Sequence, residues 1–334
     1  MFIFAVALLK QHRMKINRFI GKGVRGYMDF DIKFHKGLNF LIGINGTGKT
    51  TVIRLLKGLL QTAPESLINI GFDEISVEFD NNGDLIKYDS HIADYNLTIK
   101  KFKNDTDTND SLQIDLDEDE KNYSGLLKVF SNVKGVSFLE LDRLNDFSGD
   151  ALKEISEKIY TFVRRNIATK NKIEEEFRDS VMSLAKISGG NKDKVLLKIT
   201  EKYNKDIAEL NSPITRFENS ANLFLSEGDK VLHVDEAGEI IINFKNGDRT
   251  TSIFELSSGE KQLIIMLGHL IFDNAEVLVI DEPELSLHLS WQMIFAEALQ
   301  TASPNSQFIL ATHAPGIVAK KSNEKYCIDL TPRQ

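Results

Sequence analysis

The stretch "GINGTGKT", residues 43–50, decides the fold class of this chain. It matches the pattern G-x-x-x-x-G-K-[ST] at every position, and its glycines let successive backbone N–H groups point toward a phosphate. The apolar run "LNFLIGI" precedes it and the amphipathic "KTTVIRLLKGLL" follows it, which predicts a strand, a loop and a helix. The dipole of that helix favours an anion at its N-terminus. This order of elements predicts an α/β P-loop NTPase.

The loop residues have separate expected roles. Lys49 brings a positive charge to the β- and γ-phosphates, and the hydroxyl of Thr50 is placed to bind Mg²⁺. ATP and Mg²⁺ are therefore the expected cofactors. The expected nucleotide-binding residues in this part of the chain are Gly43, Asn45, Gly46, Thr47, Gly48, Lys49, Thr50 and Thr51.

Two later apolar runs end in polar residues. The run "VLVIDE", residues 277–282, is typical of a Walker B strand, because a buried strand-end carboxylate is costly unless a cation compensates it. Asp281 is expected to bind Mg²⁺, and Glu282 is expected to polarise the attacking water as general base. About thirty residues further on, "LATH" ends in His313, which is expected to donate to the γ-phosphate or to orient the water.

A second anion-binding pattern lies about two hundred residues after the first, in "ELSSGEKQ", residues 255–262. Ser257, Ser258 and Gly259 precede an apolar helix, so they lie at its N-terminus. One interpretation is an ordinary helix cap without a ligand. The other is a site that closes over the γ-phosphate of an ATP held by another copy of the chain. The similar "KISGGNKDK", residues 186–194, lies between two amphipathic segments and is assigned to a hairpin tip.

Composition limits the class of protein. The 334 residues are 42% hydrophobic and 27% charged, with a net charge of −8, which does not favour wrapping nucleic acid. The single cysteine, Cys327, excludes an intrachain disulfide and suits a reducing cytoplasm. The apolar run at residues 2–9 is too short to span a bilayer, so we expect no membrane segment in it.

The pattern along the chain predicts four parts. Residues 1–13 are an N-terminal extension, and residues 14–147 hold the P-loop and an antiparallel meander formed by "ISVEF", "LIKYDSHI", "LTIKKF" and "LQIDL". The acidic stretch at residues 105–120 is interpreted as a solvated loop. Residues 148–228 form a helical hairpin, and residues 229–334 form the C-terminal part of the ATPase.

The predicted hairpin has apolar residues three or four apart in two segments. The second segment is expected to end at Pro213, and the first reaches about 50 Å at 1.5 Å per residue. Basic residues such as Arg164 and Arg165 lie on the first segment. They fit either a solvated coiled-coil surface or a contact with DNA or a protein partner.

Together, "GINGTGKT", "LSSGEKQ", "VLVIDEPELSLH" and "ATHAP" resemble the ABC-type ATPase superfamily, and within it the SMC/RecF/OLD-like branch. The resemblance implies an ABC-ATPase head with a mixed sheet, an antiparallel β lobe and a helical-hairpin insertion. It also implies that two heads enclose two ATP molecules, with Ser257–Gly259 acting in trans and residues 285–288 at the junction. The stretch "GKGVRGY" is implied to contact the base, through Arg25.

Two departures from the family pattern are visible. The family places a glutamine at the end of a core strand, whereas Gln61 and Gln113 do not lie on such a strand. The expected place holds "LELDRL", which leaves Glu140, Asp142 and Arg143 as alternatives. The resemblance to OLD-type nucleases implies a Toprim nuclease domain after the ATPase. Only about twenty residues follow His313, so we expect no such domain there and no DNA cleavage by the chain itself.

Three functions are compatible with these features. The favoured one is a cytoplasmic ATPase switch, a homodimer or larger homo-oligomer that controls a separate nuclease or toxin in antiphage defence. This step rests on analogy with stand-alone OLD-like ATPases. The alternative is a RecF- or SMC-like ATPase that clamps DNA for repair or maintenance. A transporter subunit is a third possibility, which the missing core-strand glutamine and the long helical insertion disfavour.

Overall fold

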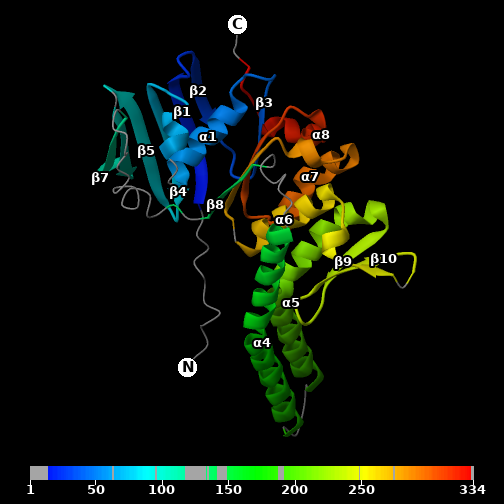
Figure 1. Cartoon of the computed structure of the whole chain (residues 1–334). Coiled ribbons are helices and arrows are strands. Elements are labelled where there is room, and N and C mark those ends of the chain that lie inside the picture. Colours follow the sequence, from blue (N-terminus) through cyan, green and yellow to red (C-terminus); the bar gives the residue numbers. More distant parts are fainter. Residues whose placement is uncertain are drawn as a thin grey trace. The chain divides into compact units, whose positions relative to one another are not determined.

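A computed structural model describes residues 14–61, 64–94, 96–116, 133, 135–140, 149–186, 192–247, 249–273 and 275–331. The chain divides into two compact units (Figure 1). The first unit comprises Met1–Asn145, Asn274–Ala296 and Pro304–Gln334, and the second comprises Asp146–Asp273 and Glu297–Ser303. None of the helices in the described ranges has the length and apolar character needed to cross a membrane.

A parallel sheet forms one layer of the first unit. Its strand order is β14-β3-β13-β12-β8, and every neighbouring pair is parallel. All residues of β12 and β13 are buried, which explains why both segments are continuous apolar runs. The predicted buried strands around "VLVID" and "QFILA" are therefore confirmed. The bounds are β3 (Leu38–Ile42), β8 (Val136–Glu140), β12 (Val277–Asp281), β13 (Gln307–Ala311) and β14 (Cys327–Asp329).

A six-stranded antiparallel sheet forms the second layer of this unit, in the order β2-β1-β4-β5-β6-β7. In β4, the side chains of Ile75, Val77 and Phe79 alternate into the core, as expected for a sheet with one buried face. The predicted meander is confirmed, and the antiparallel strands form a sheet of their own. The bounds are β1 (Met14–Val24), β2 (Met28–Lys33), β4 (Glu74–Asn81), β5 (Asp84–Ala93), β6 (Asn96–Lys103) and β7 (Thr106–Asp115).

The prediction of a solvated loop at residues 105–120 was wrong for Thr106–Asp115, which forms β7 and pairs with β6. Leu112 and Ile114 are buried two residues apart, so they bind this strand to the core. Asp107 and Asp115 are exposed at the sheet edge, whereas Asp110 is half-buried and lies 3.6 Å from the Nζ of Lys101. Charged side chains are common on edge strands because they oppose pairing with another chain. Residues 117–120 lie outside the described part of the chain.

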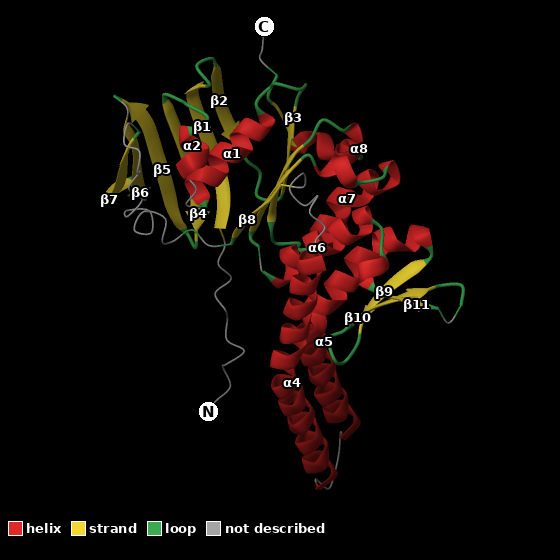
Figure 2. Ribbon diagram, in the orientation of Figure 1, coloured by secondary structure: helices red, strands yellow, loops and turns green. Residues whose placement is uncertain are grey.

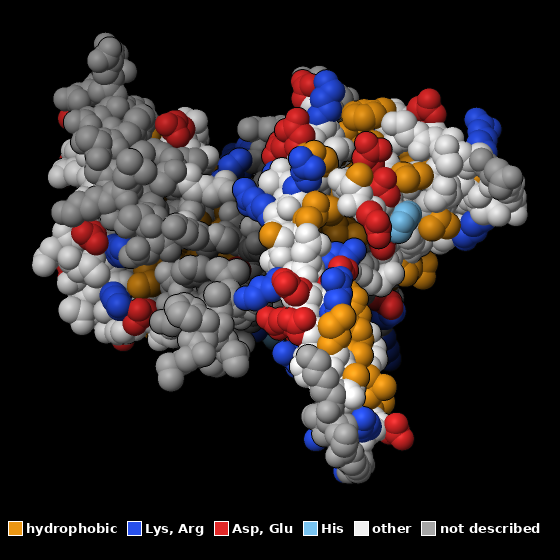
Figure 3. Space-filling model, turned by 90° about the horizontal axis from the view of Figure 1, so that it is seen from below, with side chains coloured by type: hydrophobic (Ala, Val, Ile, Leu, Met, Phe, Trp, Pro, Cys, Tyr) orange, Lys and Arg blue, Asp and Glu red, His pale blue; other side chains and the backbone are white. Residues whose placement is uncertain are grey.

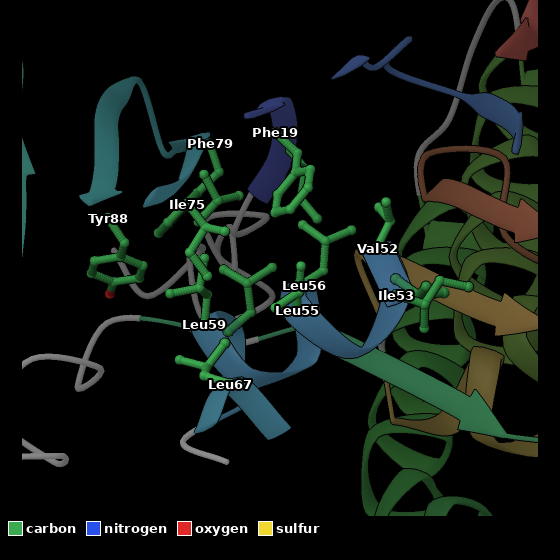
Figure 4. Close-up of a cluster of buried hydrophobic side chains, with 14 of the residues drawn as sticks. Phe19, Val52, Ile53, Leu55, Leu56, Leu59, Leu67, Ile75, Phe79 and Tyr88 are labelled. Atoms are coloured by element: carbon green, nitrogen blue, oxygen red, sulfur yellow. The ribbon is translucent and has the colours of Figure 1, made fainter. Parts of the chain in front are cut away.

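The helix α1 (Lys49–Leu60) packs against both sheets. Its residues Val52, Leu55, Leu56 and Leu59 are fully buried, as the sequence pattern predicts. They belong to one core cluster with residues of both sheets, and Figure 4 shows them pointing toward side chains of the antiparallel sheet. Each such buried side chain contributes about 2 kcal/mol by its removal from water. The helix ends before Pro64, where the short helix α2 (Pro64–Ile68) begins.

A buried glutamine joins the two layers. The side-chain Oε1 of Gln307, at the start of β13, accepts from the N–H of Ile16 at 2.8 Å. Its Nε2 donates to the carbonyl oxygens of Ile16 and His35, both at 2.8 Å. Because all these polar groups are satisfied, Gln307 can be fully buried without a desolvation penalty and fixes β1 beside the parallel sheet.

The second unit contains the predicted helical hairpin, formed by α4 (Gly149–Lys186) and α5 (Lys192–Leu225) (Figure 2). The rings of Phe177 and Tyr203 contact each other across the two helices with centroids 4.4 Å apart. Most of the "KISGGNKDK" tip lies outside the described residues. Along the hairpin, hydrophobic side chains lie between charged ones (Figure 3). The exposed large apolar side chains of the two helices include Tyr160, Ile167, Met182, Val195, Leu196 and Leu197.

The expectation that the second arm ends at Pro213 was wrong, because α5 continues to Leu225. A proline removes one helical hydrogen bond and commonly kinks or ends a helix. Here, Phe217, Ala221 and Phe224 are completely buried after the proline. Their burial stabilises the last three turns of the helix and outweighs the lost hydrogen bond.

The hairpin base packs on the helix α6 (Ser258–Phe272). Gly268 is required at this contact, because a Cβ there would lie 2.6 Å from the Cγ2 of Ile155 in α4. The second unit also contains a small sheet in the order β11-β10-β9. The remaining bounds are β9 (Lys230–Val234), β10 (Ile240–Phe244), β11 (Thr250–Thr251), α7 (Leu289–Ala302), α8 (Pro315–Val318), η2 (Ser226–Gly228), η3 (Ile253–Glu255), η4 (Pro283–Ser286) and η5 (Lys321–Tyr326).

Candidate nucleotide-binding site

Three strands of the parallel sheet end at the same edge. The P-loop follows β3, Glu282 follows β12, and His313 lies two residues after β13. The N–H of Glu282 donates to the carbonyl of Ala311 at 2.9 Å, and the N–H of Thr312 donates to Leu41 at 3.0 Å. Ligands of open α/β sheets bind at the carboxyl ends of the strands. The fold therefore brings the three predicted motifs to the edge where such ligands bind.

The turn of the P-loop depends on two glycines. Gly43 has φ 147° and Gly48 has φ 92°, both in the region that other residues avoid. A Cβ at Gly43 would lie 2.6 Å from the Oγ1 of Thr47, and one at Gly48 would lie 2.7 Å from the Cζ of Phe30. The loop therefore needs glycine at both positions for its conformation and its packing.

Lys49 begins α1 and is 6% exposed. Its Nζ donates to the carbonyl oxygens of Gly43 at 2.7 Å and Ile44 at 3.2 Å, so the ammonium lies across the loop. No side chain in the described residues caps the N-terminus of α1. Its first N–H groups have no partners within the helix and suit an anion.

A cavity of about 310 Å³ lies at this loop. Its volume falls in the range of about 300–1,000 Å³ that is usual for small-molecule sites. It is lined by Arg25, Tyr27, Met28, Asn45, Gly46, Gly48, Lys49, Thr50, Thr51 and Glu282. The structure thus brings together the loop, the predicted base contact Arg25 and the predicted general base. Seven of the predicted site residues lie in the described ranges but do not line this cavity: Gly43, Thr47, Ser257, Ser258, Gly259, Asp281 and His313.

Two lining residues, Tyr27 and Met28, were not predicted from the sequence. Tyr27 is 74% exposed, and it follows Arg25 in a turn where Arg25 and Gly26 both have positive φ. The N–H of Arg25 donates to Gly71 at 2.9 Å, which anchors this turn. The signal was present, because Tyr27 ends the same "GKGVRGY" stretch. Its aromatic ring and the guanidinium of Arg25 both suit stacking on a base.

Glu282 adopts a left-handed conformation with φ 49° and ψ 56°. For a residue with a side chain this conformation is uncommon, and such residues gather at functional sites. Glu282 lines the cavity that also contains Lys49 and Thr50. The residue before it, Asp281, is 8% exposed at the end of β12.

The residues at this edge fit Mg²⁺. Thr50 lines the cavity, and Asp281 places a carboxylate at the end of the buried strand β12, which β13 separates from β3. In the described ranges no three His, Cys, Asp or Glu residues come together as a metal cage. Mg²⁺ at phosphates commonly uses one or two protein oxygens and completes its shell with water and phosphate oxygens. A hydroxyl and one carboxylate are therefore a sufficient donor set.

His313 is 45% exposed at its side chain and is held by Glu284, a residue that the sequence did not single out. Its Nδ1 lies 3.0 Å from the Oε1 of Glu284, and its N–H donates to the same oxygen at 2.8 Å. Glu284 lies in η4, directly after the Walker B strand. Its contacts join residues 29 positions apart, which no local pattern indicates.

Which residue takes the place of the missing core-strand glutamine remains open. Gln61 caps the C-terminus of α1, and its Nε2 donates to the carbonyl of Val136 at 3.2 Å, at the start of β8. Gln113 lies on β7. Glu140 ends β8 and pairs in register with Asp281, while Asp142 and Arg143 lie outside the described residues.

The second anion-binding pattern lies in the second unit, where Ser257 caps α6. The hydroxyl of Ser257 donates to the Oε2 of Glu260 at 2.8 Å, and the N–H of Glu260 donates back to that hydroxyl at 3.4 Å. Lys230 donates to both carboxylate oxygens of Glu260, at 2.8 and 3.0 Å. Burial raises the pKa of Glu260, but the contacts with Lys230 and Ser257 outweigh it and hold the pKa below its usual range. An ordinary capping box is therefore present.

Ser258 and Gly259 form the first turn of α6, and Ser258 is exposed. The N–H groups of a first helical turn have no intrahelical partners, so they remain suited to an anion. The roles of these residues toward a nucleotide stay predictions.

Comparison with known proteins places the fold and the motifs in one family. A family described as "AAA domain, putative AbiEii toxin, Type IV TA system" matches residues 38–319, more than half of the chain. The "Retron Vc95 probable ATPase" of Vibrio cholerae serotype O1 biovar El Tor is 31% identical over 199 residues. The match covers 52% of this chain and 36% of that protein, so the chain spans about a third of the length of this relative.

Two further similarities extend over most of the chain. The "Septu protein PtuA" of Bacillus thuringiensis is 25% identical over 318 residues, 89% of this chain and 71% of that protein. The SMC head domain from Thermotoga maritima superposes with a TM-score of 0.51 at 14% identity and covers 91% of both chains, which shows the fold. The chain belongs to the AAA family whose model it matches, and its predicted resemblance to the ABC-type ATPases of the SMC/RecF/OLD-like branch is confirmed.

Proposed function

We propose that this chain binds and hydrolyses ATP and acts as a switch that assembles through ATP enclosed between two copies. The observation that carries the proposal is the cavity in which Lys49, Thr50 and Glu282 meet. A cation for phosphates, a hydroxyl for a metal and a carboxylate for water are the groups that phosphoryl transfer to water requires. Their meeting supports hydrolysis as the reaction.

Each group has a distinct task in this proposal. Lys49 and the first N–H groups of α1 bind the β- and γ-phosphates and hold them in place. Glu282 accepts a proton from the attacking water as general base. Thr50 and Asp281 hold Mg²⁺, which neutralises charge on the phosphate oxygens when it is bound. Arg25 and Tyr27 contact the base.

A second copy of the chain completes the binding site for the γ-phosphate. Ser258 and Gly259 supply an exposed hydroxyl and the first N–H groups of α6, at a helix end whose dipole attracts an anion. In the proposed assembly, these groups close over an ATP whose inner phosphates are held by the P-loop of the other copy. ATP then joins the two copies, and hydrolysis releases them.

The biological role follows from the relatives. The chain is similar to a retron probable ATPase and to a Septu protein. We infer that the switch works in the cytoplasm in antiphage defence and controls a separate effector protein, a nuclease or a toxin. The assembled state is the one that the effector recognises.

The substitution Glu282→Gln tests the reaction. It removes the base but keeps the shape of the side chain, so hydrolysis falls about a hundredfold or more while ATP binding is retained. The variant accumulates as a closed assembly with ATP, measured as a rise in molar mass by light scattering. Lys49→Ala is the control that does not assemble. Turnover at the wild-type rate in Glu282→Gln contradicts the proposed base.

Clamping of DNA is the competing function. Arg164 and Arg165 are exposed on α4, which favours it, whereas the net charge of −8 opposes it. Contact with phosphates weakens steeply as salt concentration rises. The DNA clamp predicts ATP-dependent DNA binding that weakens with salt and is lost in the double variant Arg164→Glu/Arg165→Glu. If no such binding is found, the effector switch is the favoured function.

A further inference from the structure

A groove of about 410 Å³ lies on the helical hairpin, where Phe177 of α4 contacts Tyr203 of α5. It is lined by Glu174, Phe177, Arg178, Val181, Met182 and Tyr203. Four of these six side chains are hydrophobic or aromatic, so most of the lining gains free energy when water leaves it. The groove belongs to the second unit and shares no residue with the nucleotide cavity.

Further apolar side chains of the same part of the hairpin are exposed. Met182 is 57% exposed, and Leu197, about two turns before Tyr203 on α5, is 59% exposed. The neighbours of Leu197, Val195 and Leu196, are exposed as well. Single exposed apolar residues are ordinary, but a group of them beside an apolar groove is typical of a surface that another protein covers.

Two charged residues of the groove have opposite signs and no partner. Glu174 and Arg178 are four residues apart on α4, so they lie on one face of the helix. Within the described part of the chain neither makes an ion pair or a side-chain hydrogen bond, whereas Glu176 lies 3.9 Å from the Nζ of Lys202. In a two-fold contact the same surface of two copies meets itself. An acid and a base one turn apart are therefore complementary to a second copy of themselves.

The charge of the hairpin also suits a second copy. The helix α4 carries eight basic and seven acidic residues, and α5 carries six basic and five acidic residues. Two hairpins therefore repel each other little, although the whole chain has a net charge of −8. A strongly basic or strongly acidic partner finds no excess of the opposite charge on these helices. Two helices with a shared apolar face are also half of a four-helix bundle.

We propose that this groove is a docking surface for a second copy of the chain, in which Glu174 of each copy pairs with Arg178 of the other. Phe177, Val181 and Met182 are removed from water in this contact, and both charged groups gain the partner that they lack in one copy. The contact needs no nucleotide, so it goes beyond the ATP-dependent assembly and does not rest on it. It brings two copies together before ATP binds and raises the effective concentration of one toward the other.

Sedimentation equilibrium of the nucleotide-free protein tests this surface. The groove is short beside the about 800 Å² per partner of a stable interface, so we expect a dissociation constant of about 100 μM. Between about 10 and 300 μM, the average molar mass of the wild type should therefore rise above the 37.7 kDa of one chain. A mass that stays at one chain over this range overturns the proposal and leaves the groove to a different protein.

Exchange of the two charges tests the identity of the occupant. Glu174→Arg and Arg178→Glu each place like charges opposite each other, so each should weaken association about fivefold or more. In Glu174→Arg/Arg178→Glu both pairs form again with reversed signs, and association should return to within about twofold of the wild type. A second copy explains this recovery, because both sides of the contact change together. Single variants that associate as the wild type does, or a double variant that stays weakened, overturn the pairing.

The apolar part of the groove is tested by Met182→Glu. A charge at this position must be desolvated in the contact, so association should weaken about tenfold or more. Ser183→Glu is the matched control, because Ser183 is exposed on the same helix but does not line the groove. Circular dichroism checks that each variant keeps its helices. Equal association of Met182→Glu and Ser183→Glu overturns the proposal. Because no ATP is present, failure of the proposed hydrolysis is visible separately, as absence of wild-type turnover.

Discussion

The N-terminus of α1 and the N-terminus of α6 differ in how their backbone donors are arranged. At α1, Gly48 has a left-handed conformation and makes no side-chain cap, and Lys49 adds a positive charge. At α6, Ser257 and Glu260 form a complete capping box, and Glu260 is buried with Lys230 as its partner. The first end is prepared for an anion, whereas the second already contains a carboxylate of its own.

The difference indicates that the two helix ends have different roles in binding phosphate. An open helix end with a lysine binds phosphate by itself, whereas an end that holds a carboxylate repels it in part. Ser258, which is exposed, and Gly259 form the first turn of α6. In the proposed assembly, the second end meets a phosphate that the first end of another copy already holds.

Removal of the positive charge of Lys49 at the N-terminus of α1 is expected to have the largest effect, a loss of ATP affinity. In Lys49→Ala, the phosphates lose their charge-assisted partner, and ATP binding weakens by about 3 kcal/mol, about a hundredfold. Titration calorimetry measures this loss. Lys57→Ala, on the same helix, is the control and binds as the wild type does. Equal affinity of Lys49→Ala and wild type contradicts the role assigned to α1.

The first turn of α6 is expected to affect turnover and not binding. In Ser258→Arg, the first turn of α6 loses its contact with the phosphate held by the other copy, and the capping box of Ser257 stays intact. We expect hydrolysis to fall about tenfold or more, the loss typical of one removed transition-state contact. ATP affinity should stay within about twofold. Ser183→Arg, an exposed serine on α4, is the control. Parallel loss of binding and turnover argues that both helix ends hold the same nucleotide within one chain.

The smallest expected effect is that of Glu260→Gln, which changes the carboxylate of the capping box. It is a loss of folding stability that depends on pH. The pKa of Glu260 is held below its usual range, so its ionised form stabilises the folded state at pH values above the unfolded pKa. That contribution is lost as the pH falls through the folded pKa. Wild type should therefore be more stable than Glu260→Gln at about pH 7, and the difference should shrink below about pH 4.

Chemical denaturation of both proteins across this range measures the difference. The amide oxygen of glutamine keeps the hydrogen bonds of the cap, so the comparison measures the contact with Lys230. A difference that grows on acidification contradicts the assigned ion pair with Lys230.

Local patterns predicted the elements around the P-loop because strand, loop and helix are adjacent in sequence. "LNFLIGINGTGKTTVIRLL" contains its own periodicity, glycines and lysine, and α1 begins at Lys49 as expected. Walker B and the strand before His313 were predicted for the same reason, since continuous apolar runs indicate buried parallel strands.

Features set by tertiary contacts were not predicted. The contact of Glu284 with His313 depends on β12 and β13 lying side by side. The end of β7 was predicted as the run "LQIDL", whereas its start was assigned to a loop because of its acidic residues. The continuation of α5 beyond Pro213 depends on the burial of Phe217 and Phe224. In each case packing outweighed local preference.

Mixing two inactive variants tests the action between copies most directly. Lys49→Ala retains an intact α6 end, and Ser258→Arg retains an intact P-loop. If α6 acts on the ATP of the other copy, mixed dimers contain one complete site, and an equal mixture recovers up to about a quarter of wild-type hydrolysis. If the mixture is as inactive as each variant alone while mixed dimers are present, the nucleotide is not enclosed between copies.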